Sequence, residues 1–206
     1  MFEEPKAQYN ITPKKVSLED YLEMISDDKK RYEYHDGKIM DIKSATVAHG
    51  RICTNLVAQI DNCVREKDCD VFAGDRELWI ADCNKMFFPD VMVVCNNHEL
   101  KQMSKNVQAT INPSVVIEVL SESTADYDKT DKRRCYKKLK SLKQIIFISQ
   151  TEKYIHTVVR TENDRIWNEI DYFEDEELVP IGDCLIPLNE IYRRVSFDVQ
   201  SENATD

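Results

Sequence analysis

The sequence predicts an α/β or α+β domain built around a central mixed β-sheet. Its 206 residues suit one hydrophobic core. Hydrophobic residues make up 42% and charged residues 32%, a balance typical of globular proteins. Helix-like and strand-like segments alternate in the order α-ββ-α-βββ-β-α-β-ββ. We expect one domain over residues 16–195, with a flexible N-terminal arm at 1–15 and a disordered tail at 196–206.

The first predicted elements are a short helix and a hairpin. Residues 17–20 read Ser-Leu-Glu-Asp, a capping box that starts a helix running to about residue 25. An Asp-Gly pair at 36–37 separates two alternating segments, 31–35 and 38–42. Because a type I′ turn needs positive φ at both central residues, this pair predicts a two-residue hairpin.

A longer helix and three strand-like segments follow. The pattern is helical from about residue 46 to 67, where one apolar stripe contains Ile52, Leu56, Ile60 and Val64. Strand-like segments come next at 70–73, 77–81 and 86–95, and a polar connection then leads to Pro113.

The second half begins with a strand that the pattern predicts to be buried on both faces. Residues 114–120 form a nearly continuous β-branched run, which is typical of such a strand. A basic helix is predicted from about 126 to 140. The remaining predicted elements are strands at 144–149, 153–160 and 166–173 and a short helix at 188–193.

Composition excludes several classes of protein. Only four glycines occur, too few for Gly-rich phosphate loops of the P-loop or Rossmann type. A formal charge of −10 argues against a strongly basic nucleic-acid binder, although it allows a local basic patch. No apolar run approaches the roughly 20 residues of a membrane-spanning helix. The chain also starts without a signal-peptide pattern, so we expect a cytoplasmic protein with no membrane partner.

The seven cysteines show no spacing typical of a metal site or a disulfide framework. They stand at positions 53, 63, 69, 83, 95, 135 and 184, and none forms a C-x-x-C pair. Structural zinc sites use closely spaced ligand pairs, and disulfide scaffolds belong to oxidising compartments. We therefore expect small, mostly buried free thiols.

Two acidic residues interrupt strands that are otherwise apolar. Glu118 lies within Val-Val-Ile-Glu-Val-Leu, and Asp90 lies within Phe-Phe-Pro-Asp-Val-Met-Val-Val. A buried carboxylate costs several kcal/mol unless a cation or good donors compensate it. A salt bridge, or a position at the wet end of the strand, would explain Glu118, and Pro-Asp often just starts a strand or turn. If the two strands are neighbours, the two carboxylates share a site that favours a hard divalent ion such as Mg²⁺.

The basic helix that follows supplies candidate counter-charges. Lys129, Lys132 and Tyr136 are three and four residues apart, so they can share one helix face. A solvated surface is the alternative explanation for most of these charges. At least one lysine on that face could reach the sheet, because the connection after Glu118 is short.

An ordered set of motifs resembles the Uma2-type restriction endonuclease family (formerly domain of unknown function 820) of the PD-(D/E)xK nuclease superfamily. The similarity covers about residues 17–194. The segments that carry it are Tyr32-Glu33-Tyr34-His35-Asp36-Gly37-Lys38, His49, Phe88-Pro89-Asp90-Val91, residues 113–124, Asp128, Lys132, Tyr136 and residues 144–149. The resemblance implies a restriction-endonuclease-like core, a mixed sheet flanked by helices in αβββαβ order.

The resemblance also implies roles for individual residues. Asp90 and Glu118 would bind the metal, with the Val119 carbonyl as a further ligand and Glu33 as an acid contributed ahead of the sheet. The motif lysine is replaced by Leu120 here, and Lys132 on the next helix is its migrated substitute, with Lys129 as the fallback. The implied catalytic residues are Glu33, Asp90, Glu118 and Lys132. The implied substrate-binding residues are His49, Lys129, Arg133 and Tyr136.

The function implied is hydrolysis of DNA phosphodiester bonds with Mg²⁺, for which Mn²⁺ could substitute. A homodimer is one way to cleave both strands, since double-strand cleavage needs two sites or two cleavage events. Glu122 stands where the family usually has proline, and it puts a carboxylate near the phosphate path. Two alternatives stay open: a non-catalytic interaction module on the same fold, and a metal-dependent hydrolase of a substrate other than DNA.

Overall fold

The computed structural model describes residues 15–27, 31–42, 44–121 and 128–197. The predicted N-terminal arm and C-terminal tail lie almost wholly outside these ranges. Within them, two six-stranded sheets, a two-stranded sheet and a few helices make up the fold. No helix in the described ranges is both long and apolar enough to cross a membrane.

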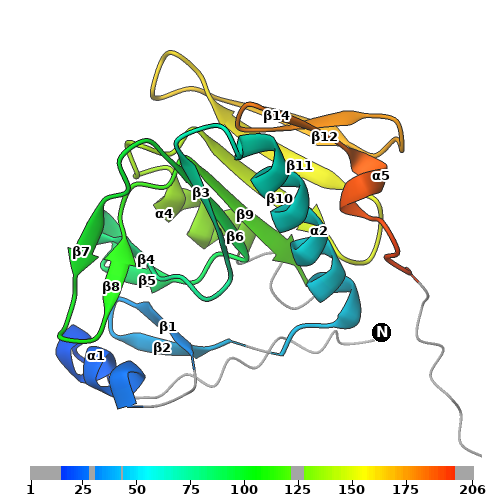
Figure 1. Ribbon diagram of the computed structural model, residues 1–206. Helices are drawn as coiled ribbons and strands as arrows, with labels where there is room; N and C mark the ends of the chain where they lie inside the picture. The colour runs from blue at the N-terminus through cyan, green and yellow to red at the C-terminus, as the bar shows by residue number, and fades with distance from the viewer. Residues whose placement is uncertain (1–14, 28–30, 43, 122–127, 198–206) are drawn as a thin grey trace, which may run out of the picture.

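A mixed sheet with the strand order β12-β11-β10-β9-β6-β3 forms the centre of the molecule (Figure 1). Its strands are β3 (Cys69–Ala73), β6 (Val91–Cys95), β9 (Val115–Leu120), β10 (Gln144–Ser149), β11 (Ile155–Arg160) and β12 (Trp167–Tyr172). Strands β9 and β10 run parallel, and the other neighbours run antiparallel. With helices α2 (Val47–Val64) and α4 (Arg133–Tyr136), the elements α2, β3, β6, β9, α4 and β10 follow the expected αβββαβ order.

Helix α2 covers one face of the central sheet (Figure 1). Thr46 caps its first turn, because the Thr46 hydroxyl accepts a hydrogen bond from His49 N at 3.1 Å. The predicted apolar stripe faces the sheet, and its members Ile52, Leu56, Ile60 and Val64 are all buried. Alternate residues of β6 and β9, such as Val91 and Ile117, complete this core.

The second six-stranded sheet, with the order β2-β1-β5-β4-β8-β7, packs on the opposite face. Its strands are β1 (Tyr32–His35), β2 (Lys38–Asp41), β4 (Leu78–Ile80), β5 (Lys85–Phe87), β7 (Leu100–Gln102) and β8 (Gln108–Thr110). Leu78 and Phe87 from this sheet pack in one core with Met92 and Val116 of the central sheet. Helix α1 (Leu18–Asp27) packs on the second sheet in a separate core through Tyr21.

The remaining elements are short. They are the 3₁₀ turn η1 (Ala81–Cys83), the π-helical turn η2 (Asp128–Lys132), the hairpin of β13 (Leu178–Ile181) with β14 (Cys184–Pro187), and helix α5 (Leu188–Ile191). The hairpin and α5 close the core on the α2 side through residues such as Val179, Ile186 and Leu188.

The predicted helix cap and the predicted hairpin turn of the N-terminal part are both confirmed. Ser17 Oγ accepts a hydrogen bond from Asp20 N at 3.0 Å, as the capping box requires. Asp36 and Gly37 have φ values of 48° and 93°, so the hairpin turn is of the kind that the Asp-Gly pair predicts. The β-branched run after Ser114 forms β9, which is buried along its whole length.

Three predicted segments differ from the structure. The prediction of a single strand over 86–95 is wrong, because this segment forms β5 and β6, which belong to different sheets. Pro89 lies between the two strands. Proline has no N–H to donate to a ladder, so it interrupts the strand at this position. The segment predicted as a polar connection contains strands β7 and β8. The sequence pattern did not predict strands β13 and β14. The predicted helix over 126–140 is shorter within the described residues, because the chain turns after Tyr136 to bury Leu139 and Leu142.

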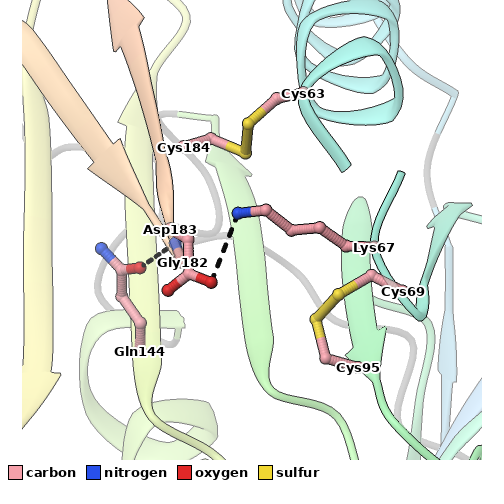
Figure 2. Close-up of a disulfide and its surroundings, with 8 residues drawn as sticks. All are labelled: Cys63, Lys67, Cys69, Cys95, Gln144, Gly182, Asp183 and Cys184. Carbon is pink, nitrogen blue, oxygen red and sulfur yellow. Dashed lines mark hydrogen bonds and ion pairs between the residues drawn. A yellow bond between two sulfur atoms is a disulfide. The ribbon is translucent and has the colours of Figure 1, made fainter. Parts of the chain in front are cut away.

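Six of the seven cysteines form disulfides, so the prediction of free thiols is wrong for these six. The pairs are Cys63–Cys184, Cys69–Cys95 and Cys83–Cys135, whose members are 121, 26 and 52 residues apart. Figure 2 shows Cys63–Cys184 joining α2 to β14, near the ion pair between Lys67 and Asp183 at 3.3 Å. The tertiary fold alone brings these partners together, so spacing along the chain does not reveal them. Cys53 keeps its thiol.

Candidate active site

A cleft of about 1060 Å³ opens beside one end of strands β6 and β9. Its lining includes residues from β1, α2, β9 and the turn η2, together with Asp90 just before β6. Its lining contains ionisable side chains from several elements, among them Glu33, His49, Cys53, Asp90, Glu118 and Lys132. Segments that are far apart in the sequence therefore meet at one concave surface.

Asp90 and Glu118 come together because their strands are neighbours. Strands β6 and β9 pair antiparallel with Val91 opposite Ile117, so the preceding Asp90 lies beside Glu118. Asp90 Oδ2 accepts a hydrogen bond from Val119 N at 2.7 Å, which fixes the aspartate against β9. Both carboxylates line the cleft, as does Val119.

Glu118 is 3% exposed and is held by two side chains from the segment after β9. Lys132 Nζ lies 3.3 Å from Glu118 Oε1, and the Tyr136 hydroxyl donates a hydrogen bond to the same oxygen. Burial and then the negative charge of Glu118 raise the pKa of Tyr136 well above its usual value, so the phenol stays a donor. The salt bridge considered for this buried acid is therefore present, and Lys132 supplies it.

Lys132 also joins Glu118 to Glu33 of strand β1. Its Nζ is 3.0 Å from Glu33 Oε1, and its side chain is only 9% exposed. Glu33 Oε2 lies 2.9 Å from His35 Nε2, and Glu33 Oε1 accepts a long hydrogen bond of 3.4 Å from Phe88 N. Burial alone would raise the pKa of Glu33, but Lys132 and His35 outweigh burial and lower that pKa to about 2. Glu33 is therefore ionised at neutral pH.

A second group of donors lies on the α2 side of the cleft. His49 Nε2 is 3.1 Å from Asp90 Oδ1, and His49 Nδ1 is 3.6 Å from the sulfur of Cys53. One ligand atom from each of His49, Cys53 and Asp90 lies within 4.8 Å of the other two. Burial lowers the pKa of His49, but the hydrogen bond and charge of Asp90, followed by the charge of Glu118, raise it on balance. For the Cys53 thiol, burial and the same two acids raise the pKa.

The structure does not bring every predicted substrate-binding residue to the cleft. Tyr136 is fully buried and supports Glu118 from behind rather than facing substrate. Arg133 is not among the residues that line the cleft, and it forms an ion pair with Glu169 of strand β12. The side chain of Lys129 lies outside the part that the structure describes. His49 is the predicted substrate-binding residue that lines the cleft.

The sequence reasoning missed Cys53 and His35. His49 and Cys53 are four residues apart, so they share one face of α2, and this spacing was a signal for them. His35 follows Glu33 by two residues on a strand, so the two share a face of β1. Neither spacing reveals that Asp90 or Lys132 lies nearby.

The donor atoms suit two kinds of metal ion. Carboxylate oxygens of Glu33, Asp90 and Glu118, with the Val119 carbonyl, are ligands that hard ions such as Mg²⁺ and Mn²⁺ prefer. Lys132 offsets part of the negative charge of Glu33 and Glu118, and a divalent ion bound by the acids would offset more of it. The imidazole of His49 and the thiol of Cys53, which lie on the other side of Asp90, suit ions of borderline hardness such as Zn²⁺.

Comparisons with known proteins point to one family. A family model for Uma2, described as "Putative restriction endonuclease", matches residues 18–189. An uncharacterized protein of the cyanobacterium Synechocystis is 32% identical over 139 residues, which cover 68% of this chain and 77% of that protein. A second uncharacterized Synechocystis protein is 29% identical over 185 residues, 89% of this chain and 94% of its own length.

A solved structure shares the fold. It is a crystal structure described as "a putative nuclease belonging to DUF820" from Anabaena variabilis, and it superposes with a TM-score of 0.68. The match covers 86% of this chain and 97% of that chain. At 17% identity, the likeness concerns the fold and not the activity.

Proposed function

The chain belongs to the Uma2 family, whose model covers most of its length, and on that premise we propose that it is a divalent-metal-dependent endonuclease that hydrolyses DNA phosphodiester bonds. The observation that carries the proposal is the position of Lys132. Its ammonium lies between Glu33 and Glu118, in the same cleft as Asp90. Three acids and one lysine converging in a cleft are the groups that metal-assisted phosphodiester hydrolysis uses.

The metal would be held on the oxygen-rich side of the cleft. We assign Asp90 and Glu118 as ligands, with the Val119 carbonyl as a further ligand and Glu33 as an additional acid. Mg²⁺ is the ion that this donor set favours, and Mn²⁺ would replace it. When bound, such an ion lowers the pKa of a coordinated water and neutralises charge on the phosphate oxygens.

The residues of the chain orient the reactants. Lys132 would hold the attacking water by a hydrogen bond or offset negative charge that develops on the phosphate. Glu33 and Glu118 restrain the lysine, and Tyr136 restrains Glu118. His49 restrains Asp90 from the other side and lines the cleft, where it would contact a phosphate of the substrate.

Substitution of Asp90 tests the proposal directly. Asp90→Asn should abolish Mg²⁺-dependent cleavage of plasmid and linear DNA, and Asp61→Asn on the exposed surface of α2 is the matched control. Circular dichroism and the melting temperature of both variants would show that the fold is intact. Equal cleavage by wild type and Asp90→Asn, or no cleavage by wild type on any DNA form, would contradict the proposal.

A non-catalytic interaction module on the same fold is the second candidate. The net charge of −10 and the pairing of Arg133 with Glu169 favour it, because both reduce the positive charge available to DNA. A module of this kind has no need of a metal. Stabilisation of the fold by Mg²⁺ therefore distinguishes the nuclease from the interaction module.

A further inference from the structure

We propose that His49, Cys53 and Asp90 form a second metal site, selective for a borderline transition-metal ion such as Zn²⁺, at the mouth of the same cleft. The site shares Asp90 with the all-oxygen centre proposed above and differs from it in its other two ligands, His49 and Cys53. Its existence does not depend on nuclease activity. Only its consequence for catalysis rests on the proposed function.

His49, Cys53 and Asp90 offer donor atoms that lie close together. His49 and Cys53 are one helical turn apart on α2, with 3.6 Å between Nδ1 and Sγ. On the other side of the ring, His49 Nε2 is 3.1 Å from Asp90 Oδ1, and one donor from each residue lies within 4.8 Å of the others. An imidazole binds an ion through one of its nitrogens, so an ion would replace one of these two contacts. Tetrahedral Zn²⁺, with bonds of about 2.0–2.3 Å, separates its ligand atoms by roughly 3.4–3.7 Å, so the side chains would rotate to bring the three donors to that separation.

The backbone that carries the ligands is held in place. Thr46 caps α2 by accepting a hydrogen bond from His49 N, and its hydroxyl also donates to Gln150 at the end of β10. Asp90 is fixed from the opposite side by Val119 N. These contacts preorganise the first turn of α2 against the central sheet, so little conformational entropy is lost when an ion binds.

Cys53 is chemically available for this role. Six cysteines are engaged in disulfides, and Cys53 keeps its thiol, half-buried at the wall of the cleft. A nitrogen, a sulfur and an oxygen donor together select Zn²⁺, Co²⁺ or Ni²⁺ over Mg²⁺, because Mg²⁺ prefers oxygen ligands. Three protein ligands also leave one tetrahedral position for water.

The acids of the cleft favour binding of a cation at these donors. The Asp–His–Cys arrangement resembles a catalytic triad, but Glu33 and Glu118 line the same cleft as the three donors. Their negative charge attracts a divalent cation, which can displace the thiol proton of Cys53.

Cobalt binding tests the site without reference to DNA. We would titrate the full-length protein, free of metal and of reducing agents, with Co²⁺ and record the thiolate-to-cobalt charge-transfer band. One equivalent should saturate the band, and one equivalent of Zn²⁺ should remove it, whereas one equivalent of Mg²⁺ should not. The band should vanish in Cys53→Ser, whereas His98→Ala, a histidine outside the cleft, should retain it. Absence of the band in wild type, or its persistence in Cys53→Ser, would overturn the proposal.

Substitution of His49 provides a second readout if Cys53→Ser is misfolded. His49→Ala should weaken Co²⁺ binding about 10- to 100-fold or more, since loss even of a supporting partner costs that much. The melting temperature of each metal-free variant shows whether it is folded. Unchanged affinity in a folded His49→Ala variant would remove the histidine from the site and contradict the proposal.

The consequence for catalysis is competition for Asp90, and this step rests on the proposed function. Zn²⁺ held by His49 and Cys53 occupies the aspartate, so it should inhibit Mg²⁺-dependent cleavage of DNA. In Cys53→Ser, inhibition should need about 10- to 100-fold more Zn²⁺, measured relative to the variant's own activity with Mg²⁺. Equal inhibition of both proteins would exclude competition through this site. If wild type shows no cleavage, the nuclease proposal fails, while the cobalt result decides the metal site independently.

Discussion

Lys132 Nζ lies 3.3 Å from Glu118 Oε1, although 14 residues separate the two in the chain. Leu120 occupies the position two residues after Glu118, where a PD-(D/E)xK motif would have its lysine, and it is buried in the core. The ammonium is instead delivered from the turn η2 after the strand. The ion pair is what a lysine displaced from the motif would form, and the assignment of Lys132 to that role stays a prediction.

Removal of Lys132 should affect both stability and cleavage. Lys132→Ala leaves Glu33 and Glu118 buried without their shared cation, so we expect a loss of about 3–5 kcal/mol in the free energy of unfolding, measured by urea denaturation. The exposed Lys140→Ala is the control and should change it by less than about 0.5 kcal/mol. DNA cleavage by the folded fraction should fall about 10²-fold or more in Lys132→Ala alone. A larger loss in Lys140→Ala would show that the lysine was misassigned.

Divalent metal should stabilise the wild-type fold. If Asp90 and Glu118 bind Mg²⁺, a concentration 100 times the dissociation constant adds about 2.7 kcal/mol to the free energy of unfolding and raises the melting temperature. Asp90→Asn should lose this response, and Asp61→Asn should retain it. A wild-type melting temperature that does not respond to millimolar Mg²⁺ or Mn²⁺ would favour the interaction module.

Tyr136 should contribute through its hydroxyl group. Tyr136→Phe removes the donor to Glu118 Oε1 and leaves a buried acceptor less satisfied, so we expect a cost of about 1–3 kcal/mol in the free energy of unfolding. Tyr154→Phe removes a hydroxyl that donates to the exposed Asp171, and it should cost less. Equal losses in the free energy of unfolding would show that the hydrogen bond to Glu118 stabilises the fold no more than the exposed hydrogen bond does.

The disulfides make a prediction that mass spectrometry can check. Alkylation of the denatured, unreduced protein should modify one thiol, that of Cys53, and alkylation after reduction should modify seven. Seven modifications without reduction would contradict all three bonds. Cys63→Ser combined with Cys184→Ser should lower the free energy of unfolding by about 2–5 kcal/mol, because this bond closes a long loop. Cys53→Ser is the matched control without a disulfide.

Much of the fold could be predicted because local chemistry specifies it. The Asp36-Gly37 turn, the capped start of α1 and the apolar runs of β9 and β10 are each determined within a few residues. The segment 86–95 shows where this fails. Its apolar residues suit a strand throughout, and only tertiary pairing assigns β5 to one sheet and β6 to the other.

The acids of the candidate site stood out in the sequence because burial of a lone carboxylate is costly. That argument identifies Asp90 and Glu118 as unusual, and the structure places them on neighbouring strands. Their roles in catalysis stay a prediction. Cys53 and the three disulfides could not be found in the same way, because an apolar thiol fits a core with or without a partner, and only long-range geometry distinguishes these cases.

Strands β1 and β2 of the second sheet precede helix α2 in the chain, and its other strands follow α2. The residues of the cleft are therefore synthesised at different times. Glu33 emerges from the ribosome first, Asp90 and Glu118 follow, and Lys132 comes last. Until the turn η2 has been made, a growing chain would bury Glu33 and Glu118 without the ammonium of Lys132, which is unfavourable. We therefore expect the ion pairs of the cleft to form late during translation, and a polypeptide that ends before η2 would lack them.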